Sequence, residues 1–335
     1  GGNIAVDFTL FSELLPKDGR GRMLFLLAAF WPAGQLLTCA IAWIVIPTTN
    51  WSVFLVVCAV PSLITCFLRP LMPESPRWLL LQGQEQQALE VCCNMAELNG
   101  LKPDEVGLTK GKKLVLSNET QPLSSFEKAN RHYLLLLCSK KLWRTTLGCM
   151  IFSGMLSWGG VVTTLFMPTF LEMKGIDAMN RYLTMSLSAA AQFPGIIAAA
   201  SLGLVVGRRR PMQFSLMLVG LALVCFAAAK QRTLVLLCSC LANACLEFGW
   251  ALCHVYVPEA FPTELRASAQ GVISGSGTII SLAGPVLAAW LLDLGTAASA
   301  VGVFAIVMFC GSLVLLMLLE QETKDRDLQD WAGAT

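Results

Sequence analysis

Eight long apolar stretches constrain this chain more than any other feature of its sequence. A helix needs roughly 20 apolar residues to cross the hydrocarbon core of a bilayer. The chain is predicted to be an all-α polytopic membrane protein, because in lipid a helix satisfies its own backbone polar groups. The eight stretches are 23–46, 51–72, 146–171, 182–206, 211–229, 233–257, 268–292 and 296–319, and a shorter one covers 1–15.

The composition fits a surface that faces lipid and excludes other classes of protein. Charged residues make up 14% and hydrophobic residues 55% of the 335 residues, whereas a soluble domain is about 25% charged. The net charge of +2 excludes a nucleic-acid partner bound by phosphate neutralisation. The two histidines lie far apart, and neither a C-x-x-C spacing nor a G-x-x-x-x-G-K-[ST] motif occurs. We therefore expect no metal, no cofactor and no enzymatic activity.

One polar segment divides the apolar stretches into two unequal groups. The segment 73–144 has only short helical patches and is predicted to be a loop between two membrane halves. Residues 1–72 would belong to a first helical bundle and 145–319 to a second bundle of six helices. Residues 320–335 would form a polar tail.

The distribution of basic residues predicts which side each loop faces. Lys and Arg gather in the cytoplasmic loops of membrane proteins. One set of loops contains only Lys174, Arg181, Lys230 and Arg232, and the other contains the remaining 20 of the 24 basic residues. The central loop and the C-terminus are therefore predicted to be cytoplasmic. For the same reason the glycosylation sequon at Asn118 is expected to be unmodified.

A motif of the form E-x-x-P-x-x-x-R occurs twice, over 13–20 and 259–266. A second pair of charged marks, at 73–77 and 322–326, follows each copy at a similar offset, which indicates two parallel repeats. The second repeat contains six apolar stretches and the first only three. Symmetry therefore predicts three more helices before Gly1, so we interpret the chain as a fragment with about nine of twelve helices. The alternative is a natural nine-helix protein.

The repeated motif has the properties of a gate. Pro16 and Pro262 end their helices, because proline lacks an N–H and clashes with the preceding turn. The neighbouring carboxylate and guanidinium then lie at the membrane–water boundary. An ion pair there contributes about 0–1 kcal/mol when exposed and more when closure dehydrates it. The simpler alternative is that these residues only anchor the helix ends.

Five sequence segments carry a resemblance to a known family. They are Gly1-Gly2-Asn3 through Pro16 with Arg20-Gly21-Arg22, Pro73-Glu-Ser-Pro-Arg-Trp78, Gly207-Arg-Arg-Arg-Pro211, Tyr256 through Arg266, and Glu322-Thr-Lys-Asp-Arg326. With these the chain resembles the major facilitator superfamily, in particular its sugar, organic cation/anion and synaptic-vesicle-protein-related branch. The resemblance implies two rocking bundles, of which this chain would supply helices four to twelve.

The resemblance also implies roles for the charged residues of these motifs. In that family they form a cytoplasmic charge network that holds the outward-open state. One position departs from the family pattern, since Leu204 stands where an acidic residue usually precedes the G-R-R motif. The expected network residues are Glu13, Arg20, Glu74, Arg77, Arg208, Arg209, Glu259, Arg266 and Glu322.

Two acidic residues inside apolar stretches are candidates for binding a solute or a proton. A charge in the hydrocarbon region costs about 2.5–3.5 kcal/mol on insertion scales, so it usually faces a cavity or a partner. Asp7 could instead pair with a group on the absent helices, and Glu247 could belong to a local hydrogen-bond network. His254 is expected to be structural. Further side chains could line a cavity: Trp31, Gln35, Trp158, Thr163, Thr164, Gln192, Asn243 and Trp250.

These observations predict a secondary transporter that moves a small organic solute, either an organic ion or a sugar-like metabolite, by alternating access. Its partners would be the solute and the lipid bilayer, and protons as well if Asp7 or Glu247 couples transport to them. The alternative is a transporter-shaped membrane protein that no longer transports and acts as a binding or regulatory partner. The departure at Leu204 fits that alternative.

Overall fold

The computed structural model describes residues 2–16, 18–108, 136–175, 178–294, 297–319 and 322–323, and every regular element in these ranges is helical. The first half contains α1 (Gly2–Leu14), α2 (Arg20–Ala28), α3 (Phe30–Thr48), α4 (Trp51–Leu68), the 3-10 helix η1 (Arg69–Leu71), α5 (Pro76–Leu81) and α6 (Glu85–Leu98). The second half contains α8 (Trp143–Gly160), the π-helical η4 (Val161–Leu165), α9 (Met167–Met173), α10 (Ala178–Ala190), α11 (Gln192–Val205), α12 (Arg209–Ala228), α13 (Arg232–Ala260), α14 (Thr263–Leu294) and α15 (Ala297–Leu318).

Seven helical segments within the described ranges are long and apolar enough to cross a membrane. They coincide with seven of the eight full stretches predicted from the sequence. The remaining stretch, 146–171, is divided into α8, η4 and α9. Single π-helical turns often occur at functional sites, and η4 contributes to the central cavity described below. The short first stretch forms α1, which has 13 residues.

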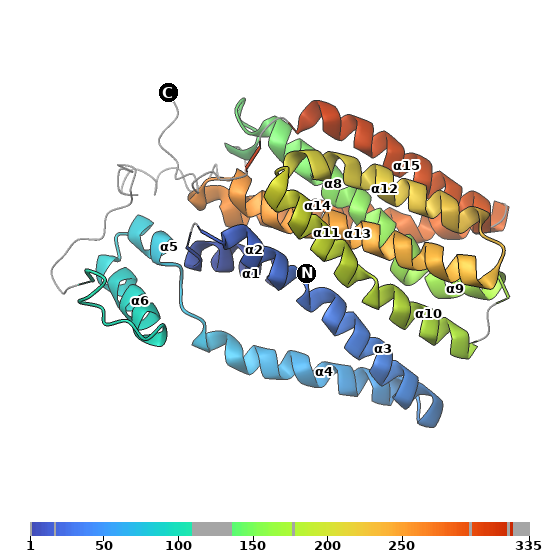
Figure 1. Cartoon of the computed structure of the whole chain (residues 1–335), viewed down its shortest axis with the longest axis horizontal. Coiled ribbons are helices and arrows are strands. Elements are labelled where there is room, and N and C mark those ends of the chain that lie inside the picture. The colour runs from blue at the N-terminus through green and yellow to red at the C-terminus, as the bar shows by residue number, and fades with distance from the viewer. Residues whose placement is uncertain are drawn as a thin grey trace.

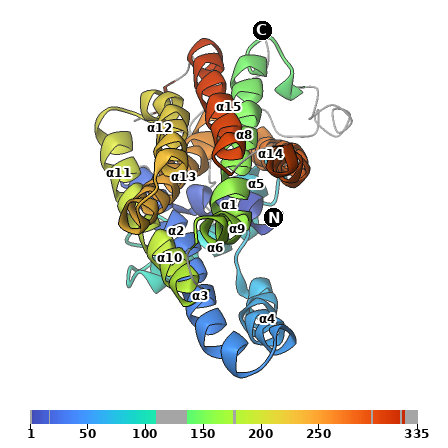
Figure 2. The same ribbon diagram turned by 90° about the vertical axis from the view of Figure 1, so that its right-hand side faces the viewer.

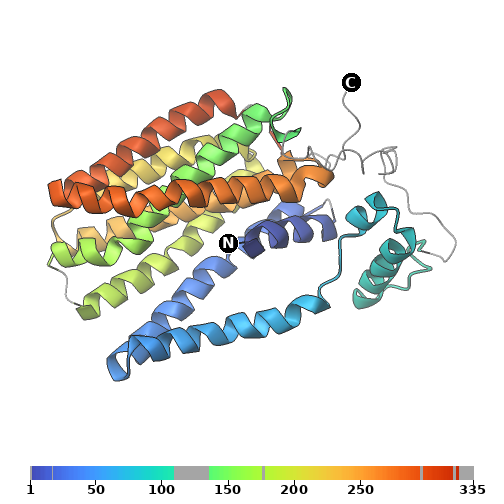
Figure 3. The same cartoon turned by 180° about the vertical axis from the view of Figure 1, so that it is seen from behind.

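The helices α1 to α4 lie along one side of the second-half bundle (Figures 1 and 3). Gly19 adopts a φ of +86° and reverses the chain between α1 and α2, as glycine does readily. Between α2 and α3 the path bends at Ala29. The cause is Pro32, which has no N–H to donate to the carbonyl of Ala28. Asn50 then caps α4, because its side chain accepts a hydrogen bond of 3.1 Å from the N–H of Val53.

The helix α13 is the packing centre of the second half. It contacts α8, α10, α11 and α12 of its own half, and also α1 and α2 of the first half. Over half of the most apolar 18-residue stretch of α13 is buried inside the protein. None of the corresponding stretch of α4 is buried. Figure 2 shows α13 among its neighbours and the hairpin of α3 and α4 projecting away from them. The apolar surface of α4 is therefore open to lipid or to other protein.

The predicted central loop is partly helical. Its helices α5 and α6 lie beyond one end of the bundle (Figure 3). Ser75 caps α5 by accepting from the N–H of Trp78 at 3.3 Å, and Pro76 occupies the first helical position, where its missing N–H has no consequence. Residues 109–135 of the loop, with Asn118, and the tail beyond Thr323 lie outside the described residues.

Close packing of α11 on α13 depends on Gly195. A Cβ at this position would overlap with the backbone carbonyl of Ala244 on α13. We expect Gly195→Ala to lower the free energy of unfolding by about 1–3 kcal/mol, which is typical of an overpacked core. Thermal melting of the purified protein in detergent measures the effect. The matched control is Gly271→Ala, because a Cβ at Gly271 meets no atom within 4 Å, and equal melting temperatures for the two variants would contradict this account.

Candidate functional site

A buried ion pair joins the two halves where α1 ends and α14 begins. Arg266 Nη1 donates to Glu13 Oε1 at 2.6 Å, and the two side chains are 0% and 5% exposed. Arg266 Nε also donates to the carbonyl of Pro258 at 2.7 Å. This contact pairs the acidic residue of the first E-x-x-P-x-x-x-R copy with the basic residue of the second. We call this part of the molecule the charged end.

The reciprocal residues of the two copies lie at the same end. Glu259 Oε1 accepts from Arg208 Nη2 at 3.1 Å, and its other oxygen accepts from Thr323 Oγ1 at 2.7 Å. Arg20 lies close enough for its charge to act on Glu259. A Cβ on Gly21 would overlap with the guanidinium of Arg208, so glycine is what lets α2 approach it. One pair, Glu13 with Arg266, therefore links the two motif copies across the halves, whereas Glu259 pairs with Arg208 of its own half.

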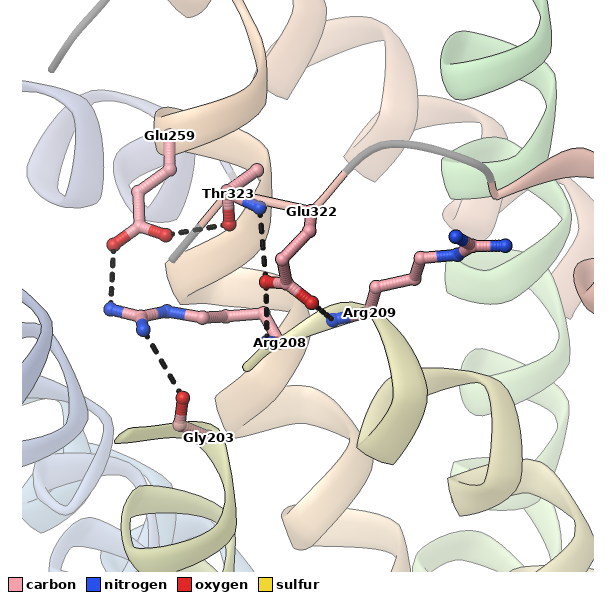
Figure 4. Close-up of polar contacts among 6 residues, drawn as sticks. All are labelled: Gly203, Arg208, Arg209, Glu259, Glu322 and Thr323. Atoms are coloured by element: carbon pink, nitrogen blue, oxygen red, sulfur yellow. Dashed lines mark hydrogen bonds and ion pairs between the residues drawn. The ribbon is translucent and has the colours of Figure 1, made fainter. Parts of the chain in front are cut away.

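A carboxylate caps the N-terminus of α12 within the same network (Figure 4). Glu322 accepts from the backbone N–H groups of Arg208 and Arg209 at 2.8 and 3.2 Å. Anions are favoured at helix N-termini, where N–H groups lack intrahelical partners. Gly207 precedes them with a φ of +105°, and a Cβ there would overlap with the Glu322 carboxylate. These contacts account physically for the glycine of the G-R-R motif, and the side chain of its first arginine, Arg208, pairs with Glu259.

Two of the expected network residues are not members of the pairs described above. Glu74 is exposed, and within the described ranges it makes no ion pair. Arg77, on α5, is half-buried. The helix carrying Arg77 packs against both α1 and α14, so it adjoins the charged end without contributing to the pairs described above.

A central cavity lies between the first half and the second. It has two lobes of about 460 Å³ each. Five residues line both lobes, which makes the lobes adjoining parts of one cavity: Trp31, Gln35, Thr164, Gln192 and Asn243. The first lobe extends past Cys39 and Met185, and the second past Glu247 and Trp250. Both volumes are in the range of small-molecule sites.

One face of α13 supplies much of the second lobe. Glu247, Trp250 and His254 follow one another at spacings of three and four residues, which places them on the same helical face. Glu247 is 5% exposed and has no hydrogen bond within the described part of the chain. His254 is stacked between Trp250 and Phe8, with ring centroids 5.4 and 4.5 Å away. This stack connects α13 to α1.

The other candidate solute residues have contacts of their own. Asp7 pairs with Arg69 at 3.0 Å and lines neither lobe. Trp158 also lies outside the lining and donates its indole N–H to the carbonyl of Ile280 at 2.6 Å. Gln35 lies in the lining and accepts a hydrogen bond from Gln192. These positions favour pairing for Asp7 and helix packing for Trp158.

Several residues of both sites give no signal in the sequence. Phe8 looks like any apolar residue of a helix, and Arg69 looks like a simple positive anchor. Thr323 stands beside an acidic motif residue, but threonine is common at such positions. The motifs contain Gly21 and Gly207, yet their pattern does not say which side chain each glycine accommodates. The contacts of all five come from tertiary packing.

The profile of the family described as "Sugar (and other) transporter" matches residues 1–332. The chain belongs to this family. It is therefore an integral multi-pass membrane protein with the major facilitator fold, and its family is one of transporters and not of enzymes. This agrees with the fold and the family expected from the motifs.

Curated relatives match nearly the whole chain at low identity. Organic cation/carnitine transporter 7 of Arabidopsis thaliana is 26% identical over 97% of this chain and 71% of its own length. The putative niacin/nicotinamide transporter NiaP of Bacillus subtilis is 25% identical, with shares of 98% and 72%. The synaptic vesicle 2-related protein of Bos taurus is 26% identical, with shares of 98% and 61%. The chain thus spans between 61% and 72% of these relatives.

A solved transporter structure has the same arrangement of helices. The proton:xylose symporter XylE, bound to 6-bromo-6-deoxy-D-glucose, matches with a TM-score of 0.72. The match covers 97% of this chain and 69% of that chain. At 16% identity the likeness shows the fold and says nothing of the solute.

The cross-half ion pair is expected to be strongly coupled. Removing one partner of a buried pair costs about 3–5 kcal/mol, because the other charge is left buried alone. We expect Glu13→Gln and Arg266→Gln each to destabilise the protein, and the double variant to lose clearly less than the sum of the two. Denaturation of all four forms in detergent gives the coupling energy. The exposed pair of Lys102 and Glu105 is the control and should show about 0–1 kcal/mol; additive losses at the buried pair would contradict the assignment.

Gly207→Ala is expected to destabilise the protein for two reasons. The positive φ is unfavourable for alanine by about 1–2 kcal/mol, and the new methyl group overlaps with the Glu322 carboxylate. Gly175→Ala is the matched control, since Gly175 has a φ of +75° and open space around its Cβ position. Melting temperatures measured in detergent should fall further for Gly207→Ala than for Gly175→Ala. Equal decreases would mean that the contact with Glu322 contributes nothing.

Proposed function

We propose that this protein is a secondary transporter that moves a small organic solute by alternating access, with the central cavity as the solute site. The observation that carries the proposal is the buried pair of Glu13 and Arg266, which joins the two halves at the charged end. Family membership supports the class of activity. The binding of an organic solute in the cavity and any coupling of an ion to its movement are both parts of the proposal.

The charged end acts as the gate in this mechanism. When water is excluded from the charged end, the ion pair of Glu13 and Arg266 holds the two halves together. When water enters, the same pair contributes only about 0–1 kcal/mol, so it no longer holds the halves together and they can separate. The second pair, Arg208 with Glu259, is similarly enclosed, with side chains 5% and 10% exposed. The excess of basic residues in the central loop makes this end cytoplasmic in the proposal.

Proton coupling, if it occurs, is assigned to Glu247. Asp7 is already paired with Arg69 outside the cavity, which leaves Glu247 as the acidic residue of the lining. An ionised carboxylate buried without a partner is costly, and binding a proton or a cation removes that cost. The second possibility, that the protein binds a solute without moving it, rests on Leu204 at a position that is usually acidic in the family.

Flux through reconstituted vesicles tests the proposal. The solutes named for the relatives, carnitine, niacin and xylose, form the first panel of radiolabelled probes. We expect uptake above empty vesicles for at least one probe, and Arg266→Ala to reduce it at least tenfold while the protein still inserts. Lys102→Ala removes an exposed charge from the loop after α6 and should leave uptake unchanged. Absence of flux with retained binding would favour the non-transporting alternative.

A further inference from the structure

The second-half wall of the cavity contains side-chain oxygens that can accept hydrogen bonds from a solute. Gln192 uses its N–H₂ group on Gln35, and its own oxygen is buried without a partner in the described structure. Asn243 uses its N–H₂ group on the carbonyl of Ser239 at 3.0 Å. The Thr163 hydroxyl donates its hydrogen to the carbonyl of Gly159. The amide oxygens of Gln192 and Asn243 can therefore accept hydrogen bonds from a solute, and each amide nitrogen also keeps a second N–H.

The lining is also electrostatically one-sided. Glu247 is its acidic residue, and no Lys or Arg occurs among the described residues that line either lobe. Glu247 and Asn243 are four residues apart on α13, so their oxygens lie on one helical face. The remaining titratable side chains of the lining are His254, held between two aromatic rings, and the thiol of Cys39. A buried carboxylate without a cation among its neighbours is complementary to a positively charged solute.

Aromatic rings are placed where they can contact such a solute. Trp31 lines both lobes, and Trp250 lines the lobe of Glu247. Tryptophan is the best side-chain partner for a cation over a ring face. Trp31 is 57% exposed, which leaves much of its ring free for contact.

We propose that the solute is a protonated amine: a monovalent cation with at least one N–H donor and an apolar, ring-sized body. The carboxylate of Glu247 takes the charge, the oxygens of Gln192 and Asn243 take the N–H groups, and Trp31 and Trp250 contact the body. The inference deepens the proposed function, because it takes the central cavity as the solute site. It excludes anions as solutes and ranks amines above sugars.

Binding to the purified, unmodified chain tests the class of solute without requiring transport. Phenethylamine is the positive probe, because at neutral pH its ammonium is charged, as that of lysine is. Phenethyl alcohol is its neutral counterpart of similar shape, and the N-trimethylated amine keeps the charge but has no N–H. Quenching of tryptophan fluorescence and thermal stabilisation in detergent report affinity. We expect the amine to bind about tenfold to a hundredfold more tightly than the alcohol, and the trimethyl derivative to bind more weakly than the amine.

Variants assign the selectivity to named residues. Glu247→Gln keeps the shape of the side chain and should remove the preference for amine over alcohol, while affinity for the alcohol stays the same. Asp293→Asn removes an exposed carboxylate of α14 outside the lining and should change neither affinity. Trp31→Leu should weaken binding of the amine. Trp290→Leu is its matched control, since Trp290 is also 57% exposed but lines neither lobe.

Each outcome bears on one proposal. Equal affinity for amine and alcohol, or a preference for amine that survives Glu247→Gln, overturns the inference. A trimethyl derivative that binds as tightly as the amine overturns it as well, because the acceptors would then have no role. Selective amine binding that depends on Glu247 supports it even if no flux is detected, and in that case only the transport proposal fails.

Discussion

The buried ion pair of Glu13 and Arg266 is the contact on which the relation of the two halves depends. It lies where α1 ends and α14 begins, and both side chains are almost completely enclosed. A charge pair in such surroundings is weak evidence for net stability, because desolvation of two ions offsets much of their attraction. Its value lies in the difference between closed and open states. Water solvates both charges again as the halves separate, so the same two residues can hold the halves together in one state and let them part in the other.

The geometry around this pair depends on glycine as much as on charge. Gly21 lets α2 approach the guanidinium of Arg208, and Gly207 leaves room for the carboxylate of Glu322 at the start of α12. Glu322 in turn lies next to Thr323, which donates to Glu259. The network therefore links the ends of α12, α13 and α15 with the first half. A change at one member alters the positions of the others through short, direct contacts.

The acidic residues of the central cavity and of the charged end differ in their partners. At the charged end most acidic groups have partners, whereas in the cavity Glu247 has none within the described residues and the oxygen of Gln192 is unpartnered. Buried polar groups without partners reduce stability. Proteins retain such groups at functional sites, where a ligand supplies the missing contacts. The same contrast separates Asp7, which Arg69 pairs outside the cavity, from Glu247, although both look alike in sequence.

The sequence by itself determined the helical, membrane-spanning class, since long apolar stretches have few other stable states in lipid. It also located the charged end, because the proline and the charged residues of each motif mark where a helix leaves the membrane. What only the tertiary structure decided is which residues meet. The pairs of Glu13 with Arg266 and of Asp7 with Arg69 join positions far apart in the chain. Glu247 has no such partner among the described residues. Local pattern records the chemistry of a side chain but not its neighbours, because those are set by how helices from both halves pack around one cavity.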